Sequence, residues 1–592
     1  MFKRYIKYRI DRIFSKGLTH QLVVLVFVIV IILAVVSIFM KLVFDYPITK
    51  GFWDSLMQFI DTGNISAVEA NLGIVVTFLS VTFIGVCGWG LLIAMINNSL
   101  QDKISNLSRG NAFIMEKNHS IILGYGEEAL TIIEEFINGR AKKIVLLSKT
   151  DTDSIKKRIS FLNKKRKVDI IVRQGNPNII ENLKLLNIEK ASSISVINDN
   201  DADSIKILLS LKMIYNEAKK KSENINPMNI CVLVNNKNSI ELIKSIEEEN
   251  FIIHIVYKYG ILYKLIAQSI IYTGLSSVYE ELFSYEGPDI KIEYKHNHSN
   301  SKFVDVASKY LSDTIDSKVL LGIIKDKKSD ITNSDCKIKS EYKELYIPNP
   351  NYKIIENDKL VVLYTNYTEN EKKLDISKHI AEKTSNKNNI LLICNDKQSN
   401  ELIDTIKSYN NNEEETNIIQ INYDKIDYKS DFISKKLNEE KITKIILISE
   451  DIETDIKAIN TLLIIRQVIK EENHHIPVLS LINSIENRDL IRSDDLRDFI
   501  VSGNLIGMLM AHASFNPDML YIFNELLSED GKDIIIKKYN IGHVNKFKDT
   551  YLKLLNNNEI IIGYKKDDTI ILNPKSNEDL TNEIIVITNN SD

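Results

Sequence analysis

Cysteine and proline are scarce in this chain of 592 residues, and both shortages exclude something. The four cysteines (Cys87, Cys231, Cys336 and Cys394) lie far apart and include no CxxC pair. Thiols at such spacing exclude a disulfide framework, argue against a structural zinc site and fit a reducing compartment. The nine prolines leave little room for extended proline-rich linkers.

An excess of positive charge is also absent. Lysine and arginine number 75 and aspartate and glutamate number 79, so the net charge is −4. Binding to nucleic acid is carried mostly by a surplus of lysine and arginine, so no nucleic acid is expected as a partner. A content of 44% hydrophobic and 26% charged residues excludes wholesale disorder. The length predicts several domains.

Two long apolar runs occur near the N-terminus. Leu22–Met40 has a single polar member, and Leu72–Ile96 carries no charge over 25 residues. Each run is long enough to cross a hydrocarbon core of about 30 Å as a helix. A signal peptide is the alternative for the first run, but the run is too long and no small-residue cleavage site follows it. The sequence therefore predicts two membrane spans.

The charges beside these runs predict their orientation. Residues 1–20 hold six basic side chains against one acid, whereas residues 45–71 hold one lysine against four acids. Because basic residues concentrate on the cytoplasmic side, both termini are expected there and residues 45–71 are expected outside.

A short apolar and aromatic segment, Phe52–Ile60, lies between the two spans and is too short to cross the membrane. Asp61, Thr62, Gly63 and Asn64 follow it directly. Non-helical backbone at membrane depth persists only where it is buried in protein or lines a water-filled path. A span, a half-helix, a polar glycine-containing loop and a second span are the layout of a tetrameric pore. The alternative is an ordinary extracellular loop between two anchors.

Short apolar runs alternate with helical patterns in the cytoplasmic part. Such alternation predicts a parallel sheet with helices on both faces. The predicted strands are Ile121–Leu123, Lys143–Ser148, Val168–Val172, Ser193–Ile197 and Ile230–Val234.

A glycine turn follows the first of these strands. Gly124 and Gly126 precede Glu127, at the start of a helical stretch, and the pattern G-x-G-x-x-A is the first step of a Rossmann-like unit. The acid that would hold a ribose after the second strand is missing, since Ser148 stands near that position. Three interpretations stay open for Gly124, Gly126 and Glu127. They form a nucleotide or anion site, a site for another small regulatory ligand, or a bare tight turn.

Acidic residues cluster after the fourth strand, at Asp199, Asp201 and Asp203. Oxygen-rich loops of this kind suit calcium, which takes six to eight oxygen ligands. The alternative is helix capping, because aspartate and asparagine are favoured at helix starts. A second acidic cluster, Glu450–Asp455, follows a later apolar run.

Internal repetition indicates that this α/β unit is duplicated. Glu281–Ile290 recurs as Glu525–Ile534 at an offset of 244 residues, and Ala267-Gln268 matches Ala511-His512 at the same offset. The second copy has lost the glycine turn, because Cys394-Asn395-Asp396 stands in its place. The second copy is therefore not expected to bind a phosphate in the usual way. Each copy ends in a smaller strand-rich piece, which supports a duplication of two subdomains.

Taken in this order, the motifs make the chain resemble the CASTOR/POLLUX family of cation channels. The resemblance implies tandem RCK domains that form a gating ring of eight domains beneath a tetrameric pore. This chain departs from the family in having Gly124-Tyr125-Gly126 where members usually have Gly-Trp-Asn. Besides the pore tetrad, the residues that carry the resemblance are Arg109-Gly110, Glu116, His119, Ile121–Gly124, Ala267-Gln268, Gly274-Leu275, Val278-Tyr279-Glu280 and Glu286-Gly287.

The fold class that we predict is a membrane α-helical two-span pore domain followed by α/β Rossmann-like tandem RCK domains. The expected boundaries are a basic cytoplasmic N-terminus at 1–20, a transmembrane pore domain at 21–100 (span 22–44, pore helix and filter 52–64, span 72–96), a linker at 101–117, a first RCK Rossmann-like subdomain at 118–282 and its C-terminal subdomain at 283–370, and a second RCK Rossmann-like subdomain at 388–527 with its C-terminal subdomain at 528–592.

The predicted function is a ligand-gated homotetrameric cation channel, not an enzyme, that passes potassium, calcium or both. The compact chain is expected in a microbial plasma membrane, in contact with lipid. No cofactor is certain, and calcium or a nucleotide are the candidate gating ligands. One rival is a membrane-anchored RCK-type ligand sensor or transport regulator without its own pore. The other is a membrane-tethered NAD-dependent oxidoreductase, for which a ribose-binding acid and a catalytic His or Tyr are not evident.

Overall fold

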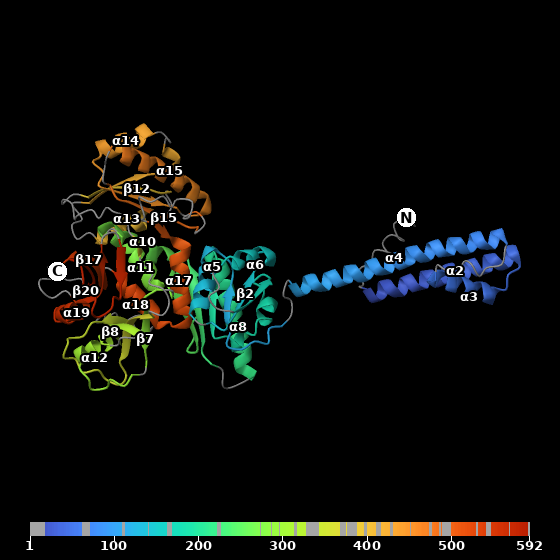
Figure 1. Ribbon diagram of the computed structural model, residues 1–592, viewed down its shortest axis with the longest axis horizontal. Coiled ribbons are helices and arrows are strands. Elements are labelled where there is room, and N and C mark those ends of the chain that lie inside the picture. The colour runs from blue at the N-terminus through green and yellow to red at the C-terminus, as the bar shows by residue number, and fades with distance from the viewer. Residues whose placement is uncertain are drawn as a thin grey trace. The chain divides into compact units, whose positions relative to one another are not determined.

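In the computed structural model the chain folds into two compact units, residues 1–111 and 112–592 (Figure 1). The structure describes residues 18–61, 71–108, 113–139, 141–162, 168–221, 226–272, 274–285, 287–294, 296–312, 316–326, 343–366, 374–375, 388–395, 399–409, 416–426, 430–449, 451–472, 476–484, 487, 499–528, 531–539, 546–566 and 569–589.

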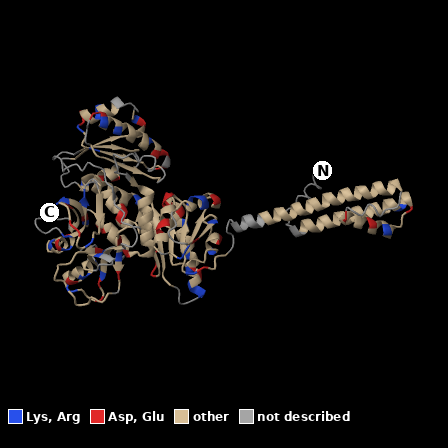
Figure 2. Ribbon diagram, viewed as in Figure 1, with Lys and Arg blue, Asp and Glu red and all other residues tan. Residues whose placement is uncertain are grey.

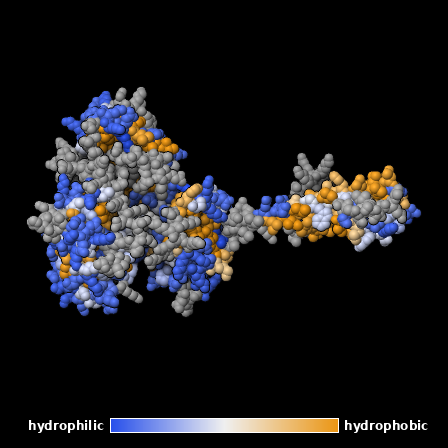
Figure 3. Space-filling view, in the orientation of Figure 1, coloured by the Kyte–Doolittle hydropathy of each residue, from blue (hydrophilic) through white to orange (hydrophobic). Residues whose placement is uncertain are grey.

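The described residues of the first unit form three helices, α2 (Leu18–Phe44), α3 (Ile48–Ile60) and α4 (Leu72–Ser108). Within α2 and α4, the stretches His20–Phe44 and Leu72–Gln101 are long and apolar enough to cross a membrane. In Figure 2 most of the ribbon of these helices is coloured as uncharged residues, and Figure 3 shows mainly hydrophobic residues on their surface. Such a surface is expected of helices that contact lipid tails.

Both predicted apolar runs are therefore helices, but α4 is longer than the sequence suggested. It continues as one helix to Ser108, so the first part of the expected linker at 101–117 is helical.

The second unit begins with a parallel sheet of six strands in the order β3-β2-β1-β4-β5-β6. All five strands predicted for this region are confirmed, and β1 and β2 pair in register from Ser120 with Ile144 to Leu123 with Leu147. The sixth strand, β6, was not predicted. The strands are β1 (Ser120–Leu123), β2 (Lys143–Ser148), β3 (Asp169–Gln174), β4 (Ser193–Val196), β5 (Met228–Val234) and β6 (Phe251–Tyr257).

Helices connect these strands and cover both faces of the sheet (Figure 1). Their inward sides supply the buried aliphatic side chains of two clusters, one on each face. The helical segments are α5 (Glu127–Asn138), α6 (Thr152–Ser160), α7 (Ile180–Lys184), η2 (Ile188–Lys190), α8 (Asp201–Lys221), α9 (Ser239–Lys244), α10 (Lys258–Ile271) and α11 (Leu275–Phe283).

A second parallel sheet has the order β13-β12-β14-β15-β16. This order reproduces β2-β1-β4-β5-β6 of the first sheet, which confirms the duplication; the described residues include no counterpart of β3. The elements are β12 (Asn388–Ile393), α13 (Ser399–Tyr409), β13 (Thr416–Ile421), η4 (Tyr423–Lys425), α14 (Ser430–Glu439), β14 (Lys444–Ile448), α15 (Ile452–Glu471), β15 (Val478–Ile482), β16 (Phe499–Val501), α17 (Ser502–Phe515) and α18 (Asp518–Leu526).

The two copies exchange their last long helices. Helix α17 of the second copy packs against α5 and against strands β4, β5 and β6 of the first sheet. There Ser514 and Ser195 share a buried hydrogen bond of 2.8 Å. In return, α10 of the first copy packs against α13 and β15 of the second copy, and Lys444 donates to the Ile270 carbonyl oxygen at 2.6 Å. The exchange makes the two copies one continuous core.

Each copy is followed by a small antiparallel sheet, as the sequence predicted. The sheets have the orders β7-β10-β8-β9 and β11-β19-β18-β20-β17. The two small sheets contact each other through helices α12 and α19. In addition, the Tyr551 hydroxyl of α19 donates to the Leu320 carbonyl oxygen of β8 at 2.7 Å. The elements are β7 (Asp289–Glu293), α12 (Phe303–Leu311), β8 (Asp316–Asp326), β9 (Lys343–Tyr346), β10 (Lys359–Asn366), β11 (Leu374–Asp375), β17 (Lys532–Lys538), α19 (Phe547–Leu555), β18 (Ile560–Lys566), β19 (Thr569–Leu572) and β20 (Glu583–Asn589).

Candidate functional site

The short helix α3 is held between the two long helices by polar bonds in a largely apolar setting. Gln58 donates to the Thr82 hydroxyl of α4 at 2.7 Å, and both side chains are buried. Ser37 of α2 donates to the Ile48 carbonyl oxygen at 2.6 Å. Phe59 of α3 packs with Leu33 and Val81 in one buried cluster. Helix α3 is therefore an integral part of this unit and not a loose connection.

Two glycines of α4 make room for α3. A β-carbon on Gly85 would lie 2.6 Å from the Phe59 carbonyl oxygen, and one on Gly88 would lie 2.9 Å from the Phe59 ring. A β-carbon on Gly90 would meet nothing within 4 Å. Within the straight run of α4, close packing accounts for Gly85 and Gly88.

Helix α3 begins four residues earlier than the predicted pore helix, directly after Pro47. Proline suits a helix start because its fixed φ angle and missing N–H cost nothing there. At the other end, the Asp61 N–H donates to the Met57 carbonyl oxygen at 2.8 Å, so Asp61 closes the helix. The helix therefore directs its partially negative end toward Asp61. Thr62, Gly63 and Asn64 lie outside the described residues.

The glycine turn after β1 is confirmed, and it needs its first glycine. Gly124 has a φ angle of +101°, and a β-carbon there would overlap the Ile197 carbonyl oxygen. Its N–H donates to the Leu147 carbonyl oxygen at 2.9 Å. A residue with a side chain is strained here by the left-handed φ value and by the overlap of its β-carbon with Ile197. The turn thus brings the start of α5 close to the end of β4.

The N-terminus of α5 is surrounded by carboxylates of the protein itself. Glu127 pairs with Arg158 at 3.5 Å, and the buried Glu128 pairs with Lys258 at 2.9 Å. Oxygen Oε2 of Glu128 lies 2.8 Å from where a β-carbon on Gly126 would stand. Glu128 therefore folds back toward the helix start, where an anionic ligand would otherwise lie. Burial alone would lower the pKa of Lys258, but the Glu128 charge raises it.

Of the predicted calcium ligands, Asp199 is closest to this carboxylate group. Burial and the nearby Glu128 charge raise the pKa of Asp199. Asp203 faces another way: it pairs with Lys149 at 3.2 Å and accepts from the Asn178 amide at 2.6 Å. Among the described residues no three His, Cys, Asp or Glu side chains are grouped so that they could hold a metal ion.

Asp201 fastens the loop after β5. Its carboxylate accepts the backbone N–H groups of Asn235 at 2.9 Å and of Asn236 at 2.8 Å. The Asn235 side chain in turn donates to the Asn198 carbonyl oxygen at 3.0 Å. Asn200, the residue before α8, accepts from the Ala202 N–H at 3.0 Å. Only the Asn200 contact is the kind expected from the helix-start alternative, since the Asp201 carboxylate bonds to the loop after β5 and not to its own helix.

The second copy repeats this arrangement with a different residue. Asp455 accepts the backbone N–H groups of Asn483 at 2.9 Å and of Ser484 at 3.0 Å. Asn483 donates to the Ser449 carbonyl oxygen at 3.1 Å, as Asn235 does to Asn198. Asp451 forms a capping box with Thr454 at the start of α15. Capping therefore explains Asp451 in the second acidic cluster; Glu450 lies outside the described residues.

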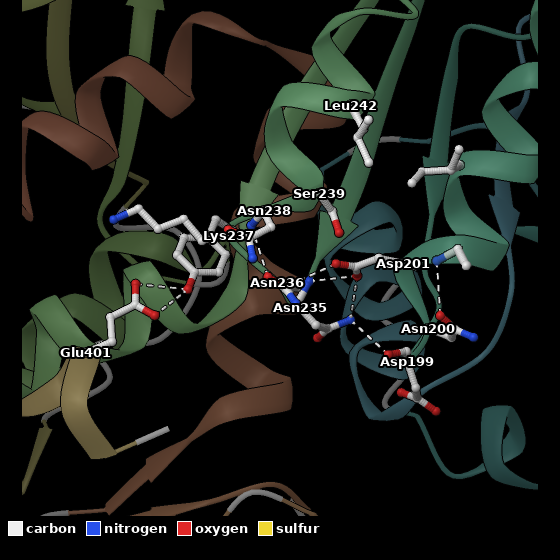
Figure 4. Close-up of a pocket in the computed structure, with 13 residues that line it drawn as sticks. Asp199, Asn200, Asp201, Asn235, Asn236, Lys237, Asn238, Ser239, Leu242 and Glu401 are labelled. Atoms are coloured by element: carbon white, nitrogen blue, oxygen red, sulfur yellow. Dashed lines mark hydrogen bonds between the residues drawn. The ribbon is translucent and has the colours of Figure 1, made fainter. Parts of the chain in front are cut away.

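A cavity of about 830 Å³ opens at the carboxyl ends of β4, β5 and β6 (Figure 4). Glu401 of α13 in the second copy closes one side, and the Tyr257 hydroxyl donates to its two oxygens at 2.9 and 2.7 Å. Of the predicted calcium ligands, Asp199 and Asp201 line this cavity and Asp203 does not, and the sequence analysis missed the asparagines after β5, Tyr257 and Glu401. The lining residues are Asp199, Asn200, Asp201, Ala202, Ile205, Asn235, Asn236, Lys237, Asn238, Ser239, Leu242, Tyr257 and Glu401.

The chain has named relatives at low sequence identity, although no protein-family model matches it. The probable ion channel POLLUX of Oryza sativa subsp. japonica is 20% identical, and the match covers 98% of this chain and 65% of that protein. The ion channel CASTOR of Lotus japonicus is 22% identical over 43% of this chain and 30% of that protein. The chain thus spans less than two thirds of these relatives. The predicted resemblance to CASTOR and POLLUX is confirmed.

The fold is also similar to that of a solved gating ring. The human SLO3 gating ring superposes with a TM-score of 0.52 at 13% identity, covering 80% of this chain and 100% of that chain. At such an identity the likeness concerns the fold alone. It agrees with the predicted fold class, two apolar N-terminal helices followed by RCK-like α/β domains. The apolar helices and the ion-channel relatives mark the chain as a membrane protein.

Proposed function

We propose that the chain is a cation channel in which α2, α3 and α4 form the pore unit and the duplicated α/β part regulates it. The observation that carries the proposal is the short helix α3, which is fastened between two apolar helices and ends at Asp61. A helix of 13 residues cannot cross the bilayer. Burying the polar side chains of Gln58 and Thr82 costs free energy that an ordinary connecting loop has no reason to spend.

One such helix per chain cannot enclose a pore, so the proposal includes a homotetramer with Asp61 near its four-fold axis. The experiment is ion flux into liposomes that contain the purified full-length protein, together with native mass spectrometry. Flux from a tetramer supports the channel. A folded protein without flux would favour the anchored sensor, and a stable dimer with no larger species would contradict the tetramer.

We expect Gly85→Ala to lower the flux by roughly tenfold, whereas Gly90→Ala keeps it. The added methyl of Gly85→Ala would press on the Phe59 backbone of α3, which cannot rotate away. Overpacking of this kind costs about 1–3 kcal/mol, and 1.4 kcal/mol corresponds to about a factor of ten. Gly90 is the matched control because its surroundings within the chain are open. Equal flux in both variants would show that the packing of α3 against α4 does not control conduction.

Asp61→Asn is expected to reduce divalent permeation relative to monovalent current by roughly tenfold or more. Four carboxylates around one axis create a negative potential that favours divalent ions, and the amide removes that charge. The measurement is the reversal potential in mixed calcium and potassium solutions. An unchanged contribution of calcium to the current would show that Asp61 is not part of the selectivity filter.

We further propose that the regulating ligand acts at the first copy, near Gly124, Gly126, Glu127 and the acids after β4. Support comes from the glycine turn, which only the first copy retains, and from the cavity beside it. The two candidate ligands are calcium and a nucleotide, and the described residues group no three side chains that could hold a metal ion by themselves. Glu127, Glu128 and Asp199 concentrate negative charge at the start of α5, and such charge repels a phosphate.

A further inference from the structure

The last turn of α3 is attached to α4 at two neighbouring points. The Gln58 amide donates to Thr82 Oγ1 at 2.7 Å, and only 2% of Gln58 and 9% of Thr82 is exposed. A little further along α4, a β-carbon on Gly85 would lie 2.6 Å from the Phe59 carbonyl oxygen. Both contacts fall within the three residues that precede Asp61. Because the two contacts lie side by side, they hold the rotation of this helix end as well as its position.

The hydroxyl of Thr82 is itself fixed in direction. It donates its proton to the Phe78 carbonyl oxygen of the same helix at 3.0 Å. A hydroxyl has one proton to donate, so towards Gln58 the oxygen acts as an acceptor and the amide must be the donor. The side chain is held in one rotamer by this backbone bond. The anchor that α4 offers to α3 is therefore rigid.

Asp61 follows the anchored turn without a break. Its N–H donates to the Met57 carbonyl oxygen at 2.8 Å, so its backbone still belongs to the turn that contains Gln58. At the other end of α3, Ser37 of α2 donates to the Ile48 carbonyl oxygen at 2.6 Å. A helix of 13 residues that is held at both ends moves as one body. A tilt or rotation at the anchored turn would therefore displace the Asp61 carboxylate and the partially negative helix end together.

Other hydroxyls of α4 do not serve as anchors in this way. Thr77 donates to the Gly73 carbonyl oxygen at 2.8 Å, and Ser80 donates to the Val76 carbonyl oxygen at 2.9 Å, both within their own helix. Thr82 differ from them because its oxygen also accepts a proton from another helix. Apolar packing alone could join α3 to α4, whereas a fully satisfied buried polar pair specifies one arrangement of the two helices.

We propose that Gln58 and Thr82 are positioning residues of the ion pathway, which act through Asp61 and set the preference between divalent and monovalent cations. The inference rests on the proposed channel function and deepens it, since it assigns ion preference to a contact outside the predicted filter. A ring of carboxylates favours divalent cations through the potential that it concentrates on the axis. That potential falls when the carboxylates move apart, because the Coulomb energy decreases with distance.

The first variant to test is Thr82→Val, which keeps the shape of the side chain and removes the hydroxyl. The measurement is the reversal potential of the full-length protein in liposomes, in mixed calcium and potassium solutions. We expect the calcium-to-potassium permeability ratio to fall by at least about threefold, since the net contribution of one hydrogen bond corresponds to about a threefold to tenfold change. An unchanged ratio in Thr82→Val would overturn the inference.

Two further variants of α4 serve as controls. Thr82→Ser keeps the hydroxyl and should restore the wild-type ratio. Thr77→Val is matched to Thr82→Val, because it removes a hydroxyl that bonds to a carbonyl oxygen of its own helix. It should keep the wild-type ratio. An equal fall of the ratio in Thr77→Val and Thr82→Val would contradict a specific role of the anchor.

A double variant separates positioning from stability. Thr82→Val alone leaves the Gln58 amide without its acceptor, whereas Gln58→Met combined with Thr82→Val replaces both polar partners by apolar groups, a change that is nearly neutral for stability. We expect the double variant to keep the wild-type melting temperature and to retain the low permeability ratio. If the pair only stabilises the fold, the ratio returns to its wild-type value together with the melting temperature.

The same substitution in a second background tests whether the anchor acts through Asp61. In Asp61→Asn the carboxylate that the anchor positions is gone, so Thr82→Val should lower the permeability ratio no further. A further fall of the same size as in the wild-type background would contradict the inference. Absence of wild-type flux would contradict the proposed channel function and this inference with it. Wild-type flux with equal ratios in wild type and Thr82→Val would contradict the inference alone.

Discussion

Gly124→Ala is expected to destabilise the first α/β domain by about 3 kcal/mol, while Gly126→Ala costs less than about 1 kcal/mol. At Gly124 the alanine must adopt a φ angle of +101° and its methyl overlaps the Ile197 carbonyl oxygen. The left-handed conformation costs about 1–2 kcal/mol and forced overpacking about 1–3 kcal/mol. Domains are stable by only about 5–15 kcal/mol, so a loss of this size is readily measured.

Gly126 is a suitable control because it occupies the same turn with a φ angle of −144°, which any residue adopts. An alanine methyl there would come closer than an ordinary contact only to Oε2 of Glu128, at 2.8 Å, while Ile197 Cγ2 at 3.7 Å is an ordinary contact. That atom ends a flexible side chain and can move aside. The measurement is denaturant unfolding of the full-length protein, followed by protease susceptibility of residues 113–257. Equal losses in both variants would mean that the turn, and not the left-handed glycine, limits stability.

The sequence was most informative where one local rule determines the structure. Strand β2 was predicted with both ends correct at Lys143 and Ser148, because a short apolar run between polar turns has one favourable conformation in a parallel sheet. Strand β6 (Phe251–Tyr257) was missed since it passes directly into α10 with no turn residue between them. Local composition carries no boundary there.

The exchange of α10 and α17 was beyond sequence reasoning for a physical reason. Both helices are apolar on most sides, so their sequences say that they are buried but not against which sheet. The repeat itself was visible, at the offset of 244 residues. Only the three-dimensional arrangement shows that Ser514 of one copy bonds to Ser195 of the other.

The acidic clusters were visible in the sequence, but their partners were not. Asp201 and Asp455 each accept two backbone N–H groups of the loop after a neighbouring strand. Their positions in the helix differ, because Asp201 is the first residue of α8 whereas Asp455 lies three residues after the start of α15. An alignment by acidic residues alone therefore pairs the wrong positions. The asparagine that follows the fifth strand, Asn235 or Asn483, is the better marker. It was overlooked because asparagine is common throughout this chain.

Asp201→Ala is expected to destabilise the first sheet, and Asp455→Ala the second, by about 2–4 kcal/mol each. Each variant leaves two backbone N–H groups without their acceptor, and a buried unsatisfied donor costs about 1–3 kcal/mol. The effect should not depend on calcium, because both bonds are made to the protein itself. Denaturant unfolding with and without calcium measures it.

Asp199→Ala is the control, and it is expected to behave in the opposite way. The pKa of Asp199 is raised above its ordinary value of 3.8 by burial and by Glu128. The folded state then binds its proton more tightly than the unfolded state, so the ionised Asp199 lowers stability progressively as the pH rises above 3.8. Asp199→Ala should therefore leave stability unchanged or raise it at neutral pH without calcium.

If calcium binds at the first copy, it should stabilise the wild type and lose that effect in Asp199→Ala. Stabilisation by calcium that survives in Asp199→Ala would place the ion elsewhere, and a calcium-dependent loss in Asp201→Ala would make Asp201 a ligand after all.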